Sequence, residues 1–314
     1  MALGGLKQRL RRGLKATGNA VSGALAIGVI NLMRLVPPDA MENAAGRLMR
    51  RIGPLFKEHK IGRANLTAAF PEKSPQEIEE ILLGVWDNLG RVGAEFAHMD
   101  RFRVDDPDNP GPVDIVYTPE VLERFHRLRT DGKPALIFTA HLANWELPAV
   151  VAAAHGLDAI SVYRRPNIAA VADAVVAIRA GSMGTLMATA MDTPVKLADA
   201  LAQGRHVGML VDQYSVRGVE VTFFGQRTRA NPLIARLARH IDCPIHGVRM
   251  IRLPGGNRFQ ADLTEAVPPV RDADGALDVQ ATMQAITSVV ESWVREYPEQ
   301  WLWLHRRWRP DDRR

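Results

Sequence analysis

A histidine and a glutamate stand five positions apart, directly behind an apolar run of the chain. The run, residues 134–140, is bounded by Asp131-Gly132-Lys133 and is typical of a buried strand. His141 would then lie where the strand ends, and Glu146 in the first turn of the following helix. From there the carboxylate can fold back to hold one imidazole nitrogen, while the other nitrogen faces a substrate. The segment therefore predicts a general base with an orienting carboxylate, the arrangement used in acyl transfer.

The same spacing also allows a purely structural interpretation. A histidine followed five residues later by a glutamate occurs often by chance, and Glu146 could be a carboxylate stabilised by the positive end of a helix. On one helix, residues five apart point about 140° away from each other. His141 and Glu146 can thus act together only if a turn separates them.

Four further polar clusters occur where later strands of the same sheet are expected to end. Each alone is compatible with a solvated surface, a capped turn or an aromatic plug over the core. Together they follow the histidine in order, which favours a composite site at the carboxyl edge of an open sheet. The clusters are residues 163–167 (YRRPN), 179–181 (RAG), 212–213 (DQ) and 298–308 (PEQWLWLHRRW).

The composition is that of an ordinary folded protein with a basic balance of charge. Its 314 residues are 46% hydrophobic, enough for one large α/β domain or two small ones. A net charge of +5 favours acidic partners, such as nucleic acid, anionic lipid, a phosphorylated substrate or an acidic protein. The single cysteine, Cys243, rules out an internal disulfide and lies in an apolar stretch. We expect it in the core of a protein from a reducing compartment.

The N-terminal segment, residues 1–38, combines basic residues with an uncharged run over residues 16–33. Eighteen helical residues span about 27 Å, slightly less than a hydrocarbon core of about 30 Å, and glycine, serine and asparagine dilute the run. Basic residues resume beyond it, and it lacks the compact apolar core of a signal peptide. We expect a retained membrane-associated helix with its basic flanks on anionic headgroups. The alternative is an ordinary soluble helix.

The remainder divides into a helical N-terminal region, residues 39–112, and an α/β core, residues 113–314. In the first, Ser74-Pro75-Gln76-Glu77 is a capping box, and the helix that it starts has apolar residues at helical spacing. A loop rich in Asp, Pro and Gly, residues 105–112, marks the boundary. Beyond it, strand-like runs alternate with helical patterns, which predicts a mostly parallel central sheet flanked by helices. The runs are residues 114–117, 135–140, 159–163, 185–188, 206–211 and 243–251, with late helices after Asn231-Pro232 and over 277–297.

These motifs, taken in order, resemble the late acyltransferases of lipid A biosynthesis, the lauroyl and myristoyl transferases of Gram-negative inner membranes. The resemblance extends from residues 65–71 (NLTAAFP) through the histidine block and the clusters above to 223–225 (FFG) and the tail. It implies transfer of a fatty acyl group from acyl carrier protein to a hydroxyl of a lipid A precursor. It also implies an N-terminal anchor and an active site on the cytoplasmic face of the inner membrane. The broader likeness is to glycerolipid acyltransferases, which pair the histidine with an aspartate at a similar spacing, and to their α/β fold.

The resemblance makes His141 the general base and Glu146 its partner. Arginine side chains would bind phosphates of the lipid precursor or the phosphopantetheine arm, and Arg164 or backbone amides near residues 143–144 would stabilise the tetrahedral oxyanion. Many relatives have glycine at the position of Ala143, and alanine fits there if the backbone keeps a negative φ. The expected substrate-binding residues are Asn144, Arg164, Arg179, Asp212, Gln213, Arg306 and Arg307.

This chemistry requires no cofactor, no metal and no covalent enzyme intermediate, because the histidine accepts the proton of the acceptor hydroxyl as that hydroxyl attacks the acyl thioester. No nucleic-acid partner is expected. Other classes stay open at this stage. A lysophospholipid or glycolipid acyltransferase of the same superfamily would share the histidine block, and a non-catalytic membrane lipid-binding protein would share the fold. A metal hydrolase is a further alternative, although the chain lacks the usual histidine spacing of zinc sites.

Overall fold

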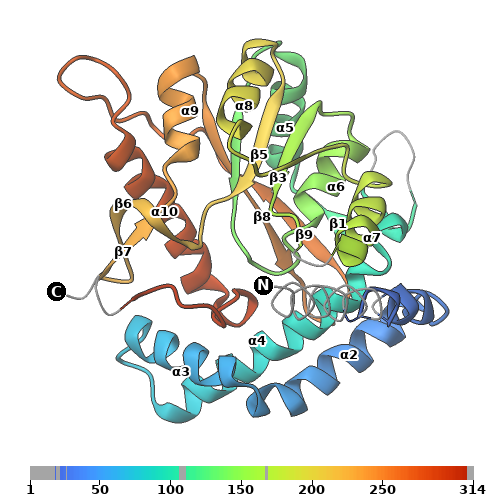
Figure 1. Ribbon diagram of the computed structural model, residues 1–314. Helices are drawn as coiled ribbons and strands as arrows, with labels where there is room; N and C mark the ends of the chain where they lie inside the picture. Colours follow the sequence, from blue (N-terminus) through green and yellow to red (C-terminus); the bar gives the residue numbers. More distant parts are fainter. Residues whose placement is uncertain (1–17, 19–21, 26, 106–110, 167–168, 310–314) are drawn as a thin grey trace, which may run out of the picture.

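The computed structural model describes residues 18, 22–25, 27–105, 111–166 and 169–309, and centres on a seven-stranded sheet (Figure 1). Neighbouring strands are parallel except for β8 and β9, which are antiparallel. The predicted mostly parallel central sheet is therefore confirmed. The strands, in spatial order, are β1 (Ile115–Val116), β9 (Phe259–Leu263), β8 (Ile245–Arg252), β2 (Leu136–Thr139), β5 (His206–Leu210), β3 (Ala159–Tyr163) and β4 (Thr185–Ala188).

Helices flank both faces of the sheet (Figure 1). On one side lie α5 (Pro119–Thr130), α6 (Leu147–Ala154) and α7 (Ala169–Ala180), and on the other lie α8 (Thr193–Ala202), α9 (Leu233–Ile241) and α10 (Val279–Glu296).

Alternating side chains along β2 connect the two layers. Phe138 is fully buried and stacks on Trp293 of α10, whereas Ile137 packs on the other face with residues of α5. Cys243 is buried as predicted, and burial raises the pKa of its thiol to about 11. The central strand thus separates a densely packed side from the side that holds the cavity described below.

Between the described N-terminal helical residues and the sheet lie α2 (Pro38–Ile52), α3 (Lys57–Ala69) and α4 (Pro75–Phe96), with short 3₁₀ turns η1 (Gly53–Leu55) and η2 (Met99–Arg101). The predicted capping box starts α4, because Ser74 Oγ accepts the backbone N–H of Glu77 and the Glu77 carboxylate accepts that of Ser74. Helix α4 packs against α2 and against η3 (Pro298–Gln300). The helical region therefore borders the C-terminal tail motif.

The predicted N-terminal membrane segment lies partly outside the described residues. Residues 22–25 and 27–33 are helical, and Leu25, Leu32 and Leu35 on and after this helix are exposed. Among the residues that the structure describes, no helix is both long and apolar enough to span a membrane. Most of the predicted boundary loop, residues 105–112, also falls outside the described residues.

Two elements go beyond those predicted from the sequence. An antiparallel hairpin of β6 (Tyr214–Phe223) and β7 (Gln226–Ala230) connects β5 to α9, and β9 adds an antiparallel strand beside β8. The hairpin turns at Phe224 and Gly225, which have φ values of 51° and 68°. Positive φ at both central positions is typical of the type I′ turn of a two-residue hairpin.

Candidate active site

His141 is held by Asp212, and the two residues follow adjacent parallel strands. Leu136–Thr139 pairs with residues 207–210, so the segments after β2 and β5 leave the sheet side by side. His141 Nδ1 lies 2.9 Å from Asp212 Oδ1. Asp212 Oδ2 accepts the backbone N–H of His141 at 2.9 Å and the indole N–H of Trp301 at 2.8 Å. The side chain of Asp212 is 0% exposed and that of His141 13%, so the carboxylate is enclosed while the imidazole keeps an open edge.

The hydrogen-bond partners assign the tautomer of His141. Nδ1 faces a carboxylate and therefore carries the proton, whereas Nε2 lies 3.3 Å from the amide nitrogen of Gln213, which can only donate. Burial lowers the pKa of His141, but the charge and hydrogen bond of Asp212 outweigh it and the pKa is raised above 6.5. Burial likewise opposes the charge of Asp212, yet the histidine lowers the pKa of that carboxyl. Nε2 thus presents a lone pair that can accept a proton.

The expected contact between Glu146 and the imidazole is wrong. Glu146 stands at the N-cap position of α6, where its side chain makes no capping hydrogen bond; the carboxylate instead forms a two-pronged ion pair with Arg179, with distances of 2.9 Å to Nε and 2.5 Å to Nη2. The guanidinium of Arg179 lies over the ring of Tyr163, 5.4 Å from its centroid. Asp212 reaches Nδ1 because it follows the neighbouring strand, while Glu146 influences His141 only through its nearby charge, which helps to raise the pKa of His141. Glu146 lines the cavity, whereas Asp212 does not line it and lies behind the histidine.

Two residues expected to bind substrate are buried in the wall behind the site. Asn144 is 1% exposed; its amide nitrogen donates to Glu95 at 2.8 Å and its oxygen accepts the backbone N–H of Glu146 at 3.0 Å. Arg307 is also 1% exposed and donates to Thr228 Oγ1 at 3.1 Å. Neither lines the cavity. Their polar groups are used to hold loops together, which the sequence pattern does not distinguish from a binding role.

The remaining predicted residues are distributed between the cavity mouth and the surface. Arg164 and Gln213 are exposed and line the cavity together with Arg179. Arg306 is exposed but does not line it. Arg165 is exposed and pairs with Asp173 at 2.7 Å. The structure therefore brings His141, Glu146, Arg164, Arg179 and Gln213 to one cavity, with Asp212 directly behind the histidine.

The C-terminal tail supports residues 140–146, the segment between β2 and α6 that we call the histidine loop. Leu142 and Trp301 form an antiparallel bridge, the N–H of Ala143 donates to Gln300 O at 2.8 Å, and that of Leu302 donates to His141 O at 3.0 Å. Ala143 has φ of 48°, so the condition of a negative φ, under which alanine fits at this position, is not met. The role of Trp301 as a donor to Asp212 was not predicted, although the tail motif pointed to the segment that contains it.

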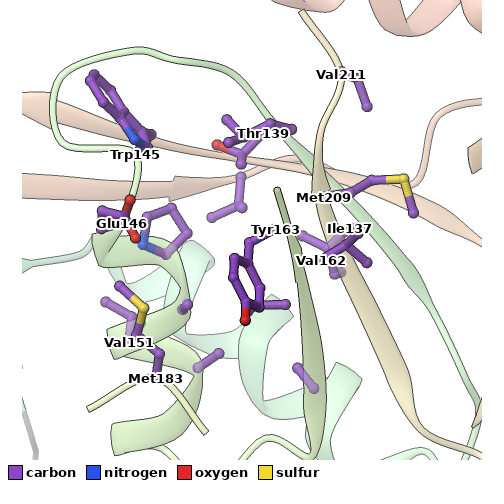
Figure 2. Close-up of a pocket in the computed structure, with 18 of the residues that line it drawn as sticks. Ile137, Thr139, Trp145, Glu146, Val151, Val162, Tyr163, Met183, Met209 and Val211 are labelled. Atoms are coloured by element: carbon purple, nitrogen blue, oxygen red, sulfur yellow. The ribbon is translucent and has the colours of Figure 1, made fainter. Parts of the chain in front are cut away.

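A cavity of about 680 Å³ opens beside His141 and runs between the sheet and helices α5 and α6. Figure 2 shows Ile137, Val151 and Val162 around it, with Trp145 and Glu146 at one end. Small side chains, such as Gly208 and Ser161 on the strands and Ala152 on α6, leave the space open. The lining includes both ends of the five-residue strand β3, so the cavity follows the strands for roughly 13 Å. Such a cavity suits a long apolar chain whose polar end meets His141.

Comparison with known proteins agrees with this arrangement. No curated protein matches the chain. The family model described as bacterial lipid A biosynthesis acyltransferase matches residues 12–310, which includes every residue of the site described above. The chain therefore belongs to the bacterial lipid A biosynthesis acyltransferase family.

Proposed function

We propose that this protein transfers a fatty acyl group of the lauroyl or myristoyl class from acyl carrier protein to a hydroxyl of a lipid A precursor. The observation that carries the proposal is the position of His141, whose Nε2 lone pair lies at the mouth of an apolar cavity. A general base at one end and space for a hydrocarbon chain at the other are the two requirements of this reaction.

His141 acts as the general base in this mechanism. Its Nε2 takes the proton of the acceptor hydroxyl as the oxygen attacks the thioester carbonyl, and Asp212 stabilises the imidazolium that forms. The tetrahedral oxyanion collapses to the ester, and the departing thiolate receives the proton from His141. An ester and a free thiol result, and no covalent enzyme intermediate or cofactor takes part.

The oxyanion needs a donor at the mouth of the cavity. The N–H of Ala143 already donates to Gln300 O, so it does not serve. Arg164 is exposed, lines the cavity and carries a permanent charge, which supports it as the donor. One such donor contributes about 3 kcal/mol to transition-state stabilisation.

The cavity between the sheet and α5 and α6 holds the acyl chain. Transfer of each methylene from water to an apolar environment contributes about 0.8 kcal/mol. Binding along the strands would hold the thioester next to Nε2, because His141 lines the same cavity. Remote apolar contacts would in this way position the reacting carbon.

We further propose that the protein works on the cytoplasmic face of the inner membrane. The support is the set of exposed apolar side chains in the described part of the N-terminal helix, together with the basic residues around it in the sequence. Apolar insertion combined with basic residues on anionic headgroups is the usual means of attaching such a segment.

The experiment is an acyl-transfer assay with purified protein, a lauroyl or myristoyl donor and three acceptors: a lipid A precursor, a lysophospholipid and a simple glycolipid. Mass spectrometry of the products identifies the acylated acceptor, and acyl carrier protein is compared with coenzyme A as the donor. We expect the lipid A precursor to be acylated, faster from acyl carrier protein. Preferred acylation of the lysophospholipid, or equal use of both donors, would overturn the proposal. The inactive control is His141→Ala.

A further inference from the structure

A buried polar cluster lies behind the histidine loop, on the side away from the cavity. Its members are Glu95 of α4, Arg252 at the end of β8, and Asn144, with 0%, 9% and 1% exposure. None of the three lines the cavity, and the proton transfer described above uses none of them. Three buried polar side chains from three separate segments therefore need another explanation.

The centre of the cluster is an ion pair. The Glu95 carboxylate takes two hydrogen bonds from Arg252, and its Oε2 also accepts the amide of Asn144 at 2.8 Å. Arg252 donates further to Asn88 Oδ1 at 2.8 Å and to Gly256 O at 2.7 Å. A buried ion pair is often replaceable by apolar residues without loss of stability. Stability alone is thus a weak explanation of this pair, and its bond to the histidine loop is a stronger one.

Asn144 connects this ion pair to the histidine loop. Its side chain reaches Glu95 with the nitrogen and the backbone N–H of Glu146 with the oxygen. The preceding residue, Ala143, is in the left-handed region, and its carbonyl accepts Asn88 at 3.1 Å. Alanine adopts such a backbone only when its surroundings impose it. Helix α4 therefore imposes the path that the chain takes between His141 and α6.

We propose that Glu95 is a positioning residue for His141 and acts through Asn144. The Glu95–Arg252 pair fixes the amide of Asn144, Asn144 fixes the start of α6, and the loop between them keeps the imidazole against Asp212. Misplacement of a reacting group by about 1 Å can cost about 10²-fold in rate. The inference rests on the proposed function for its kinetic readout only.

The principal test exchanges the acid and the amide across the contact. Asn144→Asp keeps an oxygen for the N–H of Glu146 but turns a carboxylate toward Glu95. We expect kcat to fall at least about tenfold, with KM changed much less. In the double variant Glu95→Gln/Asn144→Asp, the new amide donates to the new carboxylate, which also keeps a negative charge near Arg252. We expect kcat to return to within about threefold of wild type. If the two substitutions acted independently, the kcat of the double variant would instead be reduced by both single-variant factors multiplied together.

A readout that does not depend on the reaction is amide hydrogen exchange over residues 141–147. The variant for this measurement is Asn144→Ala, which adds no charge and can be used even if Asn144→Asp fails to fold. It should speed exchange in this segment and lower the pH at which kcat/KM declines, because His141 moves away from the carboxylate that raises its pKa. The control is Asp87→Asn, which breaks the ion pair of Asp87 with Arg91 on the same helix without touching the loop. It should leave both readouts unchanged.

The outcomes separate this inference from the proposed function. An unchanged kcat in Asn144→Asp, or a double variant no better than the product of the singles, would overturn the positioning role. Unchanged exchange over residues 141–147 in Asn144→Ala would overturn it as well. If the wild-type protein transfers no acyl group, the proposed function fails, and the exchange measurement still decides the role of Glu95.

Discussion

The indole of Trp301 donates to Asp212 Oδ2 at 2.8 Å, so the C-terminal tail completes a site whose histidine lies in the first half of the chain. The same oxygen accepts the backbone N–H of His141, and the other oxygen faces Nδ1. The carboxylate therefore has three donors in fixed positions. Its orientation depends on the tail as much as on the strand that precedes it.

Replacing Trp301 by phenylalanine should impair catalysis more than it impairs folding. Phenylalanine keeps an aromatic ring but leaves part of the buried indole volume empty, and it removes a hydrogen bond to a charged group, worth about 1.5–3 kcal/mol. We expect kcat to fall about tenfold or more in a protein that still unfolds cooperatively. Trp303→Phe is the matched control, because its indole donates to Pro298 O and not to Asp212. Equal kcat values for the two variants would show that the tail does not orient the carboxylate.

The pH dependence of kcat/KM should report the raised pKa of His141. Nε2 must be unprotonated to act as a base, so activity is lost as pH falls through this pKa, at a value above 6.5. In Asp212→Asn the raising charge is gone and burial still lowers the pKa. The acidic limb of the residual activity should therefore shift to lower pH, with a loss of about 10²- to 10⁴-fold in rate. An unshifted limb in this variant would contradict the assigned pair.

The two acidic residues of the site should differ in their contribution to the rate. His141→Ala should abolish transfer in a folded protein, and Asp212→Asn should come close to it. Glu146→Gln should cost less, because Glu146 pairs with Arg179 and not with the imidazole. Steady-state rates of the three folded variants, measured with one donor, give the order. A larger loss for Glu146→Gln than for Asp212→Asn would restore Glu146 as the partner of the histidine.

Glycine should be tolerated at Ala143 and not at Ala140. Both alanines are buried, but only Ala143 has positive φ. In Ala143→Gly, relief of the left-handed backbone strain raises the free energy of unfolding by about 1–2 kcal/mol. The flexibility of glycine lowers it by about 0.5–1 kcal/mol and the lost methyl group by about 0.8 kcal/mol, so the contributions nearly cancel. We expect the free energy of unfolding to change by less than about 0.5 kcal/mol in Ala143→Gly and to fall by about 1.5 kcal/mol in Ala140→Gly. Denaturant unfolding of both variants measures the difference, and equal losses would disprove strain at Ala143.

Deletion of residues 1–33 should weaken membrane attachment and leave the catalytic fold intact. The deletion removes the exposed Leu25 and Leu32 but keeps Arg34, which pairs with Asp100 at 2.7 Å. Fractionation of wild-type and shortened protein, with low- and high-salt washes, measures attachment, while circular dichroism checks the fold. If the shortened protein sediments with membranes as completely as the wild type in high salt, the anchor lies elsewhere.

Local patterns in the sequence predict the elements well. Residues 159–163 and 185–188 coincide with β3 and β4, and the capping box at Ser74 starts α4 where expected. These features depend on neighbours in the chain, such as side-chain volume, turn residues and helix caps. The short strand β9 was missed because its alternating residues follow a turn and show no long apolar run.

The sequence predicted part of the set of residues around the cavity, and it did not predict the partner of His141: Asn144, Arg306 and Arg307 were expected at the site and do not line the cavity. Asp212 was named as a site residue, but Glu146 was preferred as the partner of His141 because it is closer in the chain. Which carboxylate reaches Nδ1 is decided by the adjacency of β2 and β5, and strand order is not contained in local spacing. Arg307 was wrongly expected to contact the substrate, again because a long-range contact decides its place. The C-terminal tail packs against β7, and this contact buries Arg307.

Under the proposed function, the cavity beneath α5 and α6 is a part of the protein interior that stays open for the acyl chain of the substrate. Gly208, Ser161 and Ala152 occupy positions where larger apolar side chains would fill the layer between sheet and helices. Such side chains would add stability by burial, and they would also take the volume that the acyl chain needs. Every methylene of a bound chain then packs where a core side chain is missing, so the acylated donor completes the hydrophobic core and should raise the melting temperature.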